Sequence, residues 1–426
     1  MTDNEIRPFR ISTPQDQLDD LARRLNAVRW PDEAPGKGWS YGIPLDYTRR
    51  LTAYWRDGYD WHAEEARLNA LPQFRTEIDG HDLHFLHVRS TEPSALPLVL
   101  SHGWPGSIVE FLEVIGPLTD PITHGGEAAD AFDVVVPTLP GFGLSGPASG
   151  WSAARCAPAW AELMHRLGYG RYAAHGEDVG AQITRKLGLV DADRVVGVHL
   201  TMIPSATVNA ETADMSDPAE KRAAEKTARY QWELGAYGML QATRPQTLAY
   251  ALTDSPVGQL AWIVERFKDW TDSEDVPEDA VDRDAMLTNV MIYWLNRTAG
   301  SSARYYREVA ESWGAPEPPL EVPTAVAVLP HDIGTPVRRL ADTNHNIVRW
   351  THYERGGTSP RWRSRTWWWP TFARPSGPTA VKMIMAALGR APQGTVRRAS
   401  YDFRNTSRSA LNWFLRVLVS PCGAPG

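Results

Sequence analysis

Short apolar runs alternate with amphipathic segments along the first two hundred residues, and the apolar runs have the length of strands. Residues 96–100, 132–136 and 172–175 are such runs, each lying close to turn-forming residues. Residues 322–329 form a similar run far along the chain. A short apolar run bounded by turn residues is typical of a strand that is buried in a sheet. This alternation of strands and helical segments predicts an α/β protein.

The N-terminal part of the chain predicts a helix and a hairpin. Thr13 has the character of an N-cap, and Pro14 lies in the first turn of the helix that follows it. An apolar stripe along that helix is formed by Leu18, Leu21, Leu25 and Val28. Residues 74–78 and 83–88 flank an Asp79-Gly80 pair, which is a strong signal for a hairpin that opens the sheet. From about residue 201 to residue 320 the strand pattern stops, and helices take its place.

Asp178 is the candidate that narrows the chemistry most. It lies in the segment Tyr-Ala-Ala-His-Gly-Glu-Asp-Val-Gly (residues 172–180), where a strand is followed by a glycine-framed turn and an amphipathic helix. Gly176 and Gly180 permit a sharp turn and a close approach of strand and helix, which exposes the side chain between them above the sheet. A carboxylate at this place suits displacement at an sp3 carbon with an alkyl ester as intermediate. Such chemistry fits epoxides and alkyl halides better than amides or esters.

A second motif predicts an oxyanion hole. The strand at residues 96–100 runs into Ser-His-Gly-Trp-Pro-Gly-Ser (residues 101–107), a stiff turn that can fix a backbone N–H toward the nucleophile. We expect the amides of Trp104 and Val179 to be the two donors. The supporting residues of this motif are His102, Gly103 and Pro105. A third motif, Pro-Gly-Phe-Gly-Leu-Ser at residues 140–145, follows the next strand.

These parts, in this order, resemble the microsomal-type epoxide hydrolases over residues 6–357. The N-terminal extension of that family is matched by Arg29–Pro31, Gly38–Gly42, Tyr54–Trp61 and Leu68–Phe74. The resemblance implies an α/β-hydrolase fold with a helical lid and an N-terminal extension. It divides the chain into an extension with the first hairpin (1–90), a hydrolase core (91–200 and 321–357), a helical lid (201–320) and a tail outside the family pattern (358–426).

The same resemblance assigns roles to further residues. An Asp nucleophile, here Asp178, opens the epoxide while two lid tyrosines donate hydrogen bonds to its oxygen. Tyr237 matches the first lid motif, within Tyr-Gly-Met-Leu-Gln-Ala-Thr-Arg-Pro at residues 237–245, and Tyr306 matches the second. Asp332 lies where the family has the carboxylate that orients its catalytic histidine. The family usually has Trp after the nucleophile, whereas this chain has Val179; the change matters little, because the backbone amide contributes.

The catalytic histidine of the family is absent from its expected position. Residues 347–357 match the family's last strand and double glycine, but the next residue is Thr358. His102 belongs to the oxyanion turn, His175 to the strand before Asp178 and His331 to the loop of Asp332, and His345 and His352 lie before the last turn. None of them is placed to substitute for the missing histidine. From Thr358 onward the chain has eleven Lys and Arg against one acid, Asp402, a net charge of +10. Since the whole chain carries −7, residues 1–357 carry −17.

A one-base shift of the reading frame accounts for this break. Codons that encode residues 358–374 can be chosen so that the adjacent frame reads His-Phe-Ala-Ala-Val-Glu-Glu-Pro-Asp-Leu-Val-Val-Ala-Asp-Val-Arg-Ala, the continuation that the family has. The sequence therefore predicts that the frame shifts at or just before Gly357, and that one face of the sheet loses its covering helix. Two apolar stretches, residues 379–388 and 409–419, are long enough to form helices.

The sequence leaves three functions open. An epoxide hydrolase, or an inactivated copy of one, is favoured by the lid tyrosines and the extension; it would form a vicinal diol through an Asp alkyl ester, with turnover impaired by the missing histidine. A haloalkane dehalogenase shares the Asp elbow but needs N–H donors for halide, for which Val179 is unsuited. A non-catalytic binding protein on this scaffold is the third hypothesis, because the base is missing.

Composition excludes several other classes. Cys156 and Cys422 are the only cysteines, so a disulfide framework is excluded and a reducing, cytoplasmic compartment is expected. The sequence has no membrane-length apolar run, no metal-ligand cluster and no phosphate or dinucleotide motif. We therefore expect a small-molecule epoxide and water as partners, with no cofactor, metal, membrane or nucleic acid. A homodimer is left open.

Overall fold

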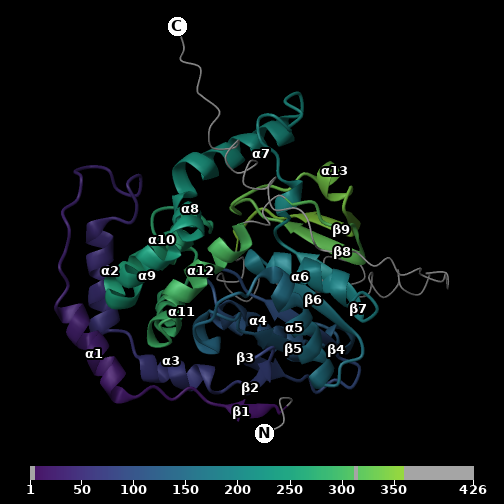
Figure 1. Cartoon of the computed structure of the whole chain (residues 1–426), viewed down its shortest axis with the longest axis horizontal. Helices are drawn as coiled ribbons and strands as arrows, with labels where there is room; N and C mark the ends of the chain where they lie inside the picture. The colour runs from purple at the N-terminus through teal and green to yellow at the C-terminus, as the bar shows by residue number, and fades with distance from the viewer. Residues whose placement is uncertain (1–4, 311–314, 359–426) are drawn as a thin grey trace.

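The computed structural model describes residues 5–310 and 315–358, and a nine-stranded sheet forms its centre (Figure 1). The strand order is β1-β2-β3-β5-β4-β6-β7-β8-β9. The strands β1, β2, β3 and β5 pair antiparallel in turn, and the strands from β5 through β4 to β9 pair parallel. The α/β class predicted from the apolar runs is confirmed.

The apolar runs of the sequence are strands of this sheet. The strands are β1 (Arg7–Phe9), β2 (Gln73–Ile78), β3 (His81–Val88), β4 (Leu96–Ser101), β5 (Phe132–Pro137), β6 (Tyr172–Gly176), β7 (Val195–Leu200), β8 (Leu320–Val328) and β9 (His345–His352). β2 and β3 form the predicted hairpin, in which Asp79 and Gly80 both have positive φ, as a two-residue turn of this kind requires. β1 was not predicted, because its three residues are too few to show alternation.

Some helices pack on the sheet, and others form a separate layer beside it. They are α1 (Gln15–Asn26), α2 (Leu45–Asp57), α3 (Trp61–Leu68), α4 (Leu112–Thr119), α5 (Ala153–Arg166), α6 (Val179–Val190), α7 (Pro218–Arg229), α8 (Ala236–Thr243), α9 (Pro245–Asp254), α10 (Pro256–Asp269), α11 (Arg283–Leu295), α12 (Ala299–Val309) and α13 (Arg338–Ala341). α6 packs on β4, β6, β7 and β8, while α4 packs on β5. α8 to α12 lie together beside the sheet (Figure 1).

The N-terminal helices hold this second layer of helices in place. α1 and α2 contact α10, and α3 contacts α11 (Figure 1). The hydroxyls of Tyr47 and Tyr54 donate to Glu278 and Asp284 at 2.9 and 2.8 Å. Residues more than two hundred positions apart in the sequence therefore fix the lid helices relative to the rest of the chain.

The start of the first helix differs in detail from the prediction. α1 begins at Gln15, and its N-cap position is Pro14 rather than Thr13. The hydroxyl of Thr13 accepts a hydrogen bond from the indole N–H of Trp61 at 2.9 Å. Its side chain therefore joins α1 to α3 instead of capping a helix. The two apolar stretches predicted at residues 379–388 and 409–419, and the exposed sheet face expected there, lie outside the described residues.

Candidate active site

Four loops meet at the carboxyl ends of the parallel strands. They follow β4, β6, β8 and β9 and carry Trp104, Asp178, Asp332 and Thr358. β4 and β6 are neighbours in the sheet. The chain continues from β4 to β5 on one side and from β6 to β7 on the other, so the strand order reverses between β4 and β6. In open α/β sheets, ligand sites form outside the carboxyl ends of the strands at this reversal. The topology therefore explains why residues from four distant segments converge here.

Asp178 lies on a strained turn between β6 and α6. Its φ and ψ are 48° and −123°, a conformation that is rare for a residue with a side chain. A Cβ atom on Gly176 would lie 2.0 Å from the carbonyl oxygen of Gly180. A Cβ atom on Gly180 would lie 2.0 Å from the carbonyl oxygen of Ser101. Both positions therefore require glycine, as the sequence predicts for a close approach of strand and helix.

Gly180→Ala is expected to destabilise the protein by roughly 3 kcal/mol, because backbone atoms of Ser101 and His102 would have to move. In an ordinary helix the same exchange would stabilise by about 1 kcal/mol, so the sign of the effect is diagnostic. Gly170→Ala, in the bend before β6, is the control for a glycine at which an added Cβ meets nothing within 4 Å. Urea unfolding of the three proteins measures both changes. A neutral Gly180→Ala would contradict the close approach.

The carboxylate of Asp178 is held by the two predicted amides. The backbone N–H of Trp104 donates to Oδ1 at 2.9 Å, and the N–H of Val179 also donates to this carboxylate. Burial raises the pKa of Asp178 to about 6, although both amide hydrogen bonds favour the charged form. The side chain is therefore mostly a carboxylate at pH 7. The same two N–H groups are placed to stabilise an oxyanion on an ester of this residue.

The supporting residues of the oxyanion motif pack under Asp178. A Cβ atom on Gly103 would lie 2.4 Å from Cβ of Asp178, so this position also requires glycine. The ring of His102 is buried, and its Nε2 accepts from the N–H of Leu139 at 3.1 Å. Its Nδ1 therefore carries the hydrogen and donates to the carbonyl of Gly103 at 3.0 Å. Burial lowers the pKa of His102 to about 4, so His102 is a neutral structural residue.

Helix α11 braces the same turn from the lid side. The side-chain amide of Asn289 donates to the carbonyl of Pro105 at 2.7 Å. The hydroxyl of Tyr293 donates to the carbonyl of Gly106, also at 2.7 Å. These contacts fix the backbone that follows Trp104 and tie the oxyanion turn to α11.

The two lid tyrosines converge on Trp104, next to Asp178. The rings of Trp104 and Tyr237 are stacked, with centroids 5.1 Å apart, and Tyr306 meets Trp104 edge-on at 5.6 Å. The hydroxyls of Tyr306 and Tyr237 share a hydrogen bond. Burial raises the pKa of both hydroxyls well above the usual value, so both are neutral donors at pH 7. The charge of Asp178 raises both pKa values further.

The Pro140–Ser145 motif contacts the helix that carries Tyr306. The hydroxyl of Ser301 on α12 donates to the carbonyl of Gly141 at 2.6 Å. Gly141 has a φ of 89°, which only glycine adopts readily. The carboxylate of Glu308 at the other end of α12 accepts from the N–H of Gly150 at 2.7 Å. This loop therefore anchors both ends of the helix on which Tyr306 lies.

Asp332 is buried after β8, and one of its oxygens has two hydrogen-bond donors. Oδ1 accepts from the N–H of Ile333 at 2.7 Å and from the hydroxyl of Thr358 at 2.9 Å. Oδ2 is buried without a hydrogen-bond partner among the described residues. Burial raises the pKa of Asp332 to about 7, although the Thr358 hydroxyl and the ammonium of Lys226 favour the charged form. Asp332 is thus a carboxyl group with one oxygen available for a further donor.

Thr358 occupies the place next to this acid. Its side chain is buried, and its N–H donates to the carbonyl of Trp270 at 3.0 Å. A Cβ atom on the preceding Gly357 would lie 1.7 Å from that carbonyl oxygen, so the double glycine permits the approach. The residues through Thr358 are therefore held between the Asp332 loop and α10.

The chain matches two family models. The model for the epoxide hydrolase N terminus covers residues 6–111, and the α/β hydrolase fold model covers residues 97–255. The chain is 46% identical over 355 residues to a protein of Stigmatella aurantiaca whose name gives epoxide hydrolase as an inferred activity, covering 83% of this chain and 80% of that protein. It is 31% identical over 388 residues to epoxide hydrolase 1 of Oryctolagus cuniculus, covering 84% and 85%.

The chain belongs to the microsomal-type epoxide hydrolases. A solved structure, the juvenile hormone epoxide hydrolase of Bombyx mori, superposes with a TM-score of 0.76 at 28% identity and covers 84% of this chain and 91% of its own. The Aspergillus niger epoxide hydrolase gives a TM-score of 0.72 at 29% identity, covering 84% and 92%. These matches confirm the family resemblance and the α/β-hydrolase fold with an N-terminal extension that the sequence predicts.

In this epoxide hydrolase the sequence-predicted residues lie together. Asp178, Trp104 and Val179 form one hydrogen-bonded group; Tyr237 and Tyr306 pack on Trp104. Asp332 is close enough for its charge and that of Asp178 to influence each other. Their catalytic roles stay predictions.

Three neighbours of this group were missed by sequence reasoning. The hydroxyl of Tyr230 lies 2.8 Å from that of Tyr237, and the ring of Trp270 lies 5.1 Å from the ring of Tyr237. The guanidinium of Arg266 lies over both of those rings, at 5.1 Å from Tyr237 and 5.5 Å from Trp270. Tyr230 could have been found, because a spacing of seven residues puts it on the face of Tyr237 in a helix. Trp270 and Arg266 carry no comparable signal.

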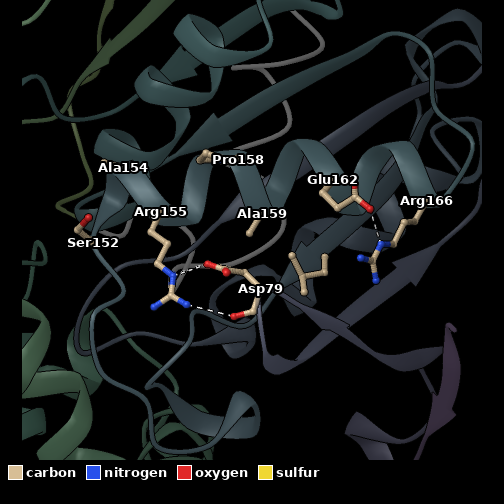
Figure 2. Close-up of a pocket in the computed structure, with 9 residues that line it drawn as sticks. Asp79, Ser152, Ala154, Arg155, Pro158, Ala159, Glu162 and Arg166 are labelled. Atoms are coloured by element: carbon tan, nitrogen blue, oxygen red, sulfur yellow. Dashed lines mark hydrogen bonds and ion pairs between the residues drawn. The ribbon is translucent and has the colours of Figure 1, made fainter. Parts of the chain in front are cut away.

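A separate groove of about 580 Å³ lies on α5 beside the β2–β3 turn, and none of the predicted site residues lines it (Figure 2). Its charged side chains pair with one another: Arg155 binds Asp79, and Arg166 binds Glu162 at 2.6 Å (Figure 2). The charged residues of the groove are therefore explained as surface ion pairs.

Two further observations concern residues 5–310 and 315–358 only. Within these ranges, no group of three or more His, Cys, Asp and Glu side chains is placed to hold a metal ion. No helix of this part of the chain is both long and apolar enough to cross a membrane.

Proposed function

We propose that this epoxide hydrolase opens epoxides by attack of Asp178 and retains the opened epoxide as an ester on that residue. The observation that carries this proposal is the arrangement of Asp178 between two backbone donors and beside two neutral phenols, with Thr358 on the acid Asp332. The first half of the reaction has its groups in place, and the second half lacks a base.

The ring-opening step uses groups that all contact Trp104, namely the carboxylate of Asp178 and the two tyrosines. A carboxylate oxygen of Asp178 forms a bond to a ring carbon, and the carbon–oxygen bond of the ring breaks with its electron pair on oxygen. That oxygen takes a proton from Tyr237 or Tyr306, a general-acid contribution of roughly 10²–10⁴-fold. Because both hydroxyls are buried and neutral, they can donate throughout the neutral pH range.

Hydrolysis of the ester requires water to attack its carbonyl carbon and a base to accept a proton from that water. The family supplies a histidine oriented by the acid, and its release product is a vicinal diol. In this chain the hydroxyl of Thr358 is bound to Asp332 and is far too weak a base for this task. The Trp104 and Val179 amides would still stabilise the oxyanion, so hydrolysis is slow rather than impossible.

We infer that Thr358 stands in the place of the histidine because the reading frame shifts by one base at or just before Gly357. The adjacent frame supplies His as its first residue, followed by residues of the family type. The two relatives described above cover 83% and 84% of this chain, which leaves about 68 to 72 of 426 residues unmatched, close to the length of the segment after Thr358. Resequencing the gene across the codons for residues 355–365 tests this inference directly.

Incubation with styrene oxide, followed by intact-mass analysis, tests the proposed function. We expect a persistent mass increase of one epoxide, located on Asp178 by peptide mapping, and little diol. Asp178→Ala is the control and should show no increase. A chain with the frame restored from codon 358 should release diol, whereas Thr358→His alone should restore little turnover, because its supporting segment would still differ.

Each other outcome is informative. Rapid diol release by the chain as written would support ring opening and overturn the missing base. Neither adduct nor diol would overturn the proposal and favour a binding protein on this scaffold. Chloride release from a test alkyl halide, without reaction with epoxides, would favour a haloalkane dehalogenase.

A further inference from the structure

A third tyrosine hydroxyl, that of Tyr230, lies next to the hydroxyl of Tyr237. Tyr230 is on the π-helical turn η6 (Tyr230–Leu234), just before α8, and its hydroxyl oxygen lies 2.8 Å from that of Tyr237. The two rings meet edge-on, with centroids 6.5 Å apart. Since Tyr237 also shares a hydrogen bond with Tyr306, the three hydroxyls form a chain with Tyr237 in the middle.

The hydrogen count of this chain decides its direction during the reaction. A phenol has one hydrogen to donate and two lone pairs that accept. If Tyr237 donated to Tyr230, its only hydrogen would point away from the epoxide oxygen. Tyr237 can donate to the substrate only when neither neighbour takes its hydrogen. Tyr230 must then donate to Tyr237, and Tyr306 must either donate to Tyr237 or bind the epoxide oxygen itself.

We infer that Tyr230 is a positioning residue for ring opening, which donates a hydrogen bond to the oxygen of Tyr237 and so directs the hydrogen of Tyr237 toward the epoxide oxygen. The inference rests on the proposed attack by Asp178. It assigns to the π-helical turn a definite task, because this turn carries the hydroxyl that meets Tyr237.

The surroundings of Tyr237 favour the same role. When Tyr237 gives its proton to the alkoxide, negative charge develops on its oxygen, and a donated hydrogen bond from Tyr230 stabilises that charge. The guanidinium of Arg266 lies over the ring of Tyr237 at 5.1 Å and adds positive charge on the ring face. Arg266 is itself fixed by a hydrogen bond to the carbonyl of Leu234, at the end of η6, at 3.2 Å.

Every proton that moves in this step is accounted for. The Tyr237 O–H bond breaks as the new O–H bond of the alkyl ester's hydroxyl forms, and Tyr237 becomes a phenolate that Tyr230 stabilises by its hydrogen bond. Tyr237 regains a proton from water afterwards. Tyr230 keeps its own hydrogen throughout, so it acts through Tyr237 and does not touch the substrate.

The test is the rate of adduct formation on Asp178, followed by intact mass, in the full chain and in Tyr230→Phe. We expect the maximal rate to fall roughly 10- to 100-fold, the effect of losing a hydrogen bond to a charged group. The epoxide concentration that gives half the maximal rate should stay unchanged. The loss should be larger with 1,2-epoxypropane than with 1,1,1-trifluoro-2,3-epoxypropane. The ring oxygen of the trifluoro compound becomes a less basic alkoxide, so its ring opening depends less on proton donation.

Tyr59→Phe is the matched control. Its hydroxyl lies 2.9 Å from that of Thr288, where the N-terminal extension meets the lid, so it removes a hydroxyl of similar setting outside the site. Equal rates of adduct formation in Tyr230→Phe and the unaltered chain would overturn the inference. An equal rate loss with both epoxides, together with a lowered melting temperature, would also overturn it, because it would indicate that Tyr230 contributes packing alone. Failure of the unaltered chain to form any adduct would instead overturn the proposed function.

Discussion

Asp178→Asn should abolish adduct formation, with a loss of at least about 10⁴-fold in the rate of ring opening. An amide of the same shape keeps the hydrogen bond from the N–H of Trp104, so the geometry of the site is preserved while the nucleophilic charge is removed. The measurement is the mass increase with styrene oxide over time. An adduct on another residue at an unchanged rate would contradict the assignment of Asp178.

The pH dependence of the unaltered chain provides an independent check on the same residue. In the proposed mechanism Asp178 attacks only as a carboxylate, and burial raises its pKa to about 6. The rate of adduct formation should therefore be level above pH 7 and fall about tenfold by pH 5. If the rate instead held constant down to pH 5, the raised pKa would be excluded.

Unfolding does not account for the loss expected in Asp178→Asn, because burial of the charge opposes folding. The folded-state pKa of about 6 lies above the usual 3.8, so the charged form is less stable in the folded protein. Removal of the charge should leave the melting temperature at pH 8 unchanged or raised. Asp178→Ala provides a second variant. Unlike the Asn side chain of Asp178→Asn, an alanine cannot be converted back to a carboxylate by deamidation.

Asp332→Asn should remove a large pH dependence of stability. Burial raises the pKa of Asp332 from 3.8 to about 7, so the folded state binds its proton more tightly than the unfolded state does. The destabilisation is absent below pH 3.8, grows between pH 3.8 and pH 7, and is complete above pH 7. Its size is roughly 4 kcal/mol, since one pKa unit corresponds to about 1.4 kcal/mol.

Urea unfolding between pH 4 and pH 8 measures this effect. The unaltered chain should lose stability over this range by roughly 4 kcal/mol more than Asp332→Asn does, whatever the amide contributes on its own. Asp193→Asn, an exposed acid in the turn before β7, is the control and should follow the unaltered chain. Parallel curves for the unaltered chain and Asp332→Asn would contradict the raised pKa of Asp332.

The parts of the fold that repeat a simple pattern could be predicted from the sequence. Buried parallel strands read as apolar runs. Glycine is needed at positions 176 and 180 because a Cβ atom at either one would lie 2.0 Å from a backbone carbonyl oxygen. The hairpin at Asp79-Gly80 follows from the positive φ angles that its turn requires. In each case one local requirement determines the residue type.

Other features depend on contacts that the sequence does not reveal. Trp270 supplies a carbonyl to Thr358 and a ring to Tyr237, but it follows α10 without a motif, and only tertiary packing brings it to the site. The sequence predicts that Thr13 caps a helix, but in the structure its hydroxyl accepts a hydrogen bond from the indole N–H of Trp61 instead. The spacing of Tyr230 and Tyr237 is visible, yet only the structure shows that their hydroxyls meet.

The attachment of the lid helices to α1, α2 and α3 has a consequence for the proposed reaction. Tyr47 and Tyr54 tie the layer of helices that carries Tyr237 and Tyr306 to the N-terminal helices. If these tyrosines bind the epoxide oxygen as proposed, that oxygen is held in one position and the two ring carbons compete for the place in line with the carboxylate. We therefore expect the substituents that fit around a stationary oxygen, rather than a movement of the lid helices, to decide which ring carbon is attacked.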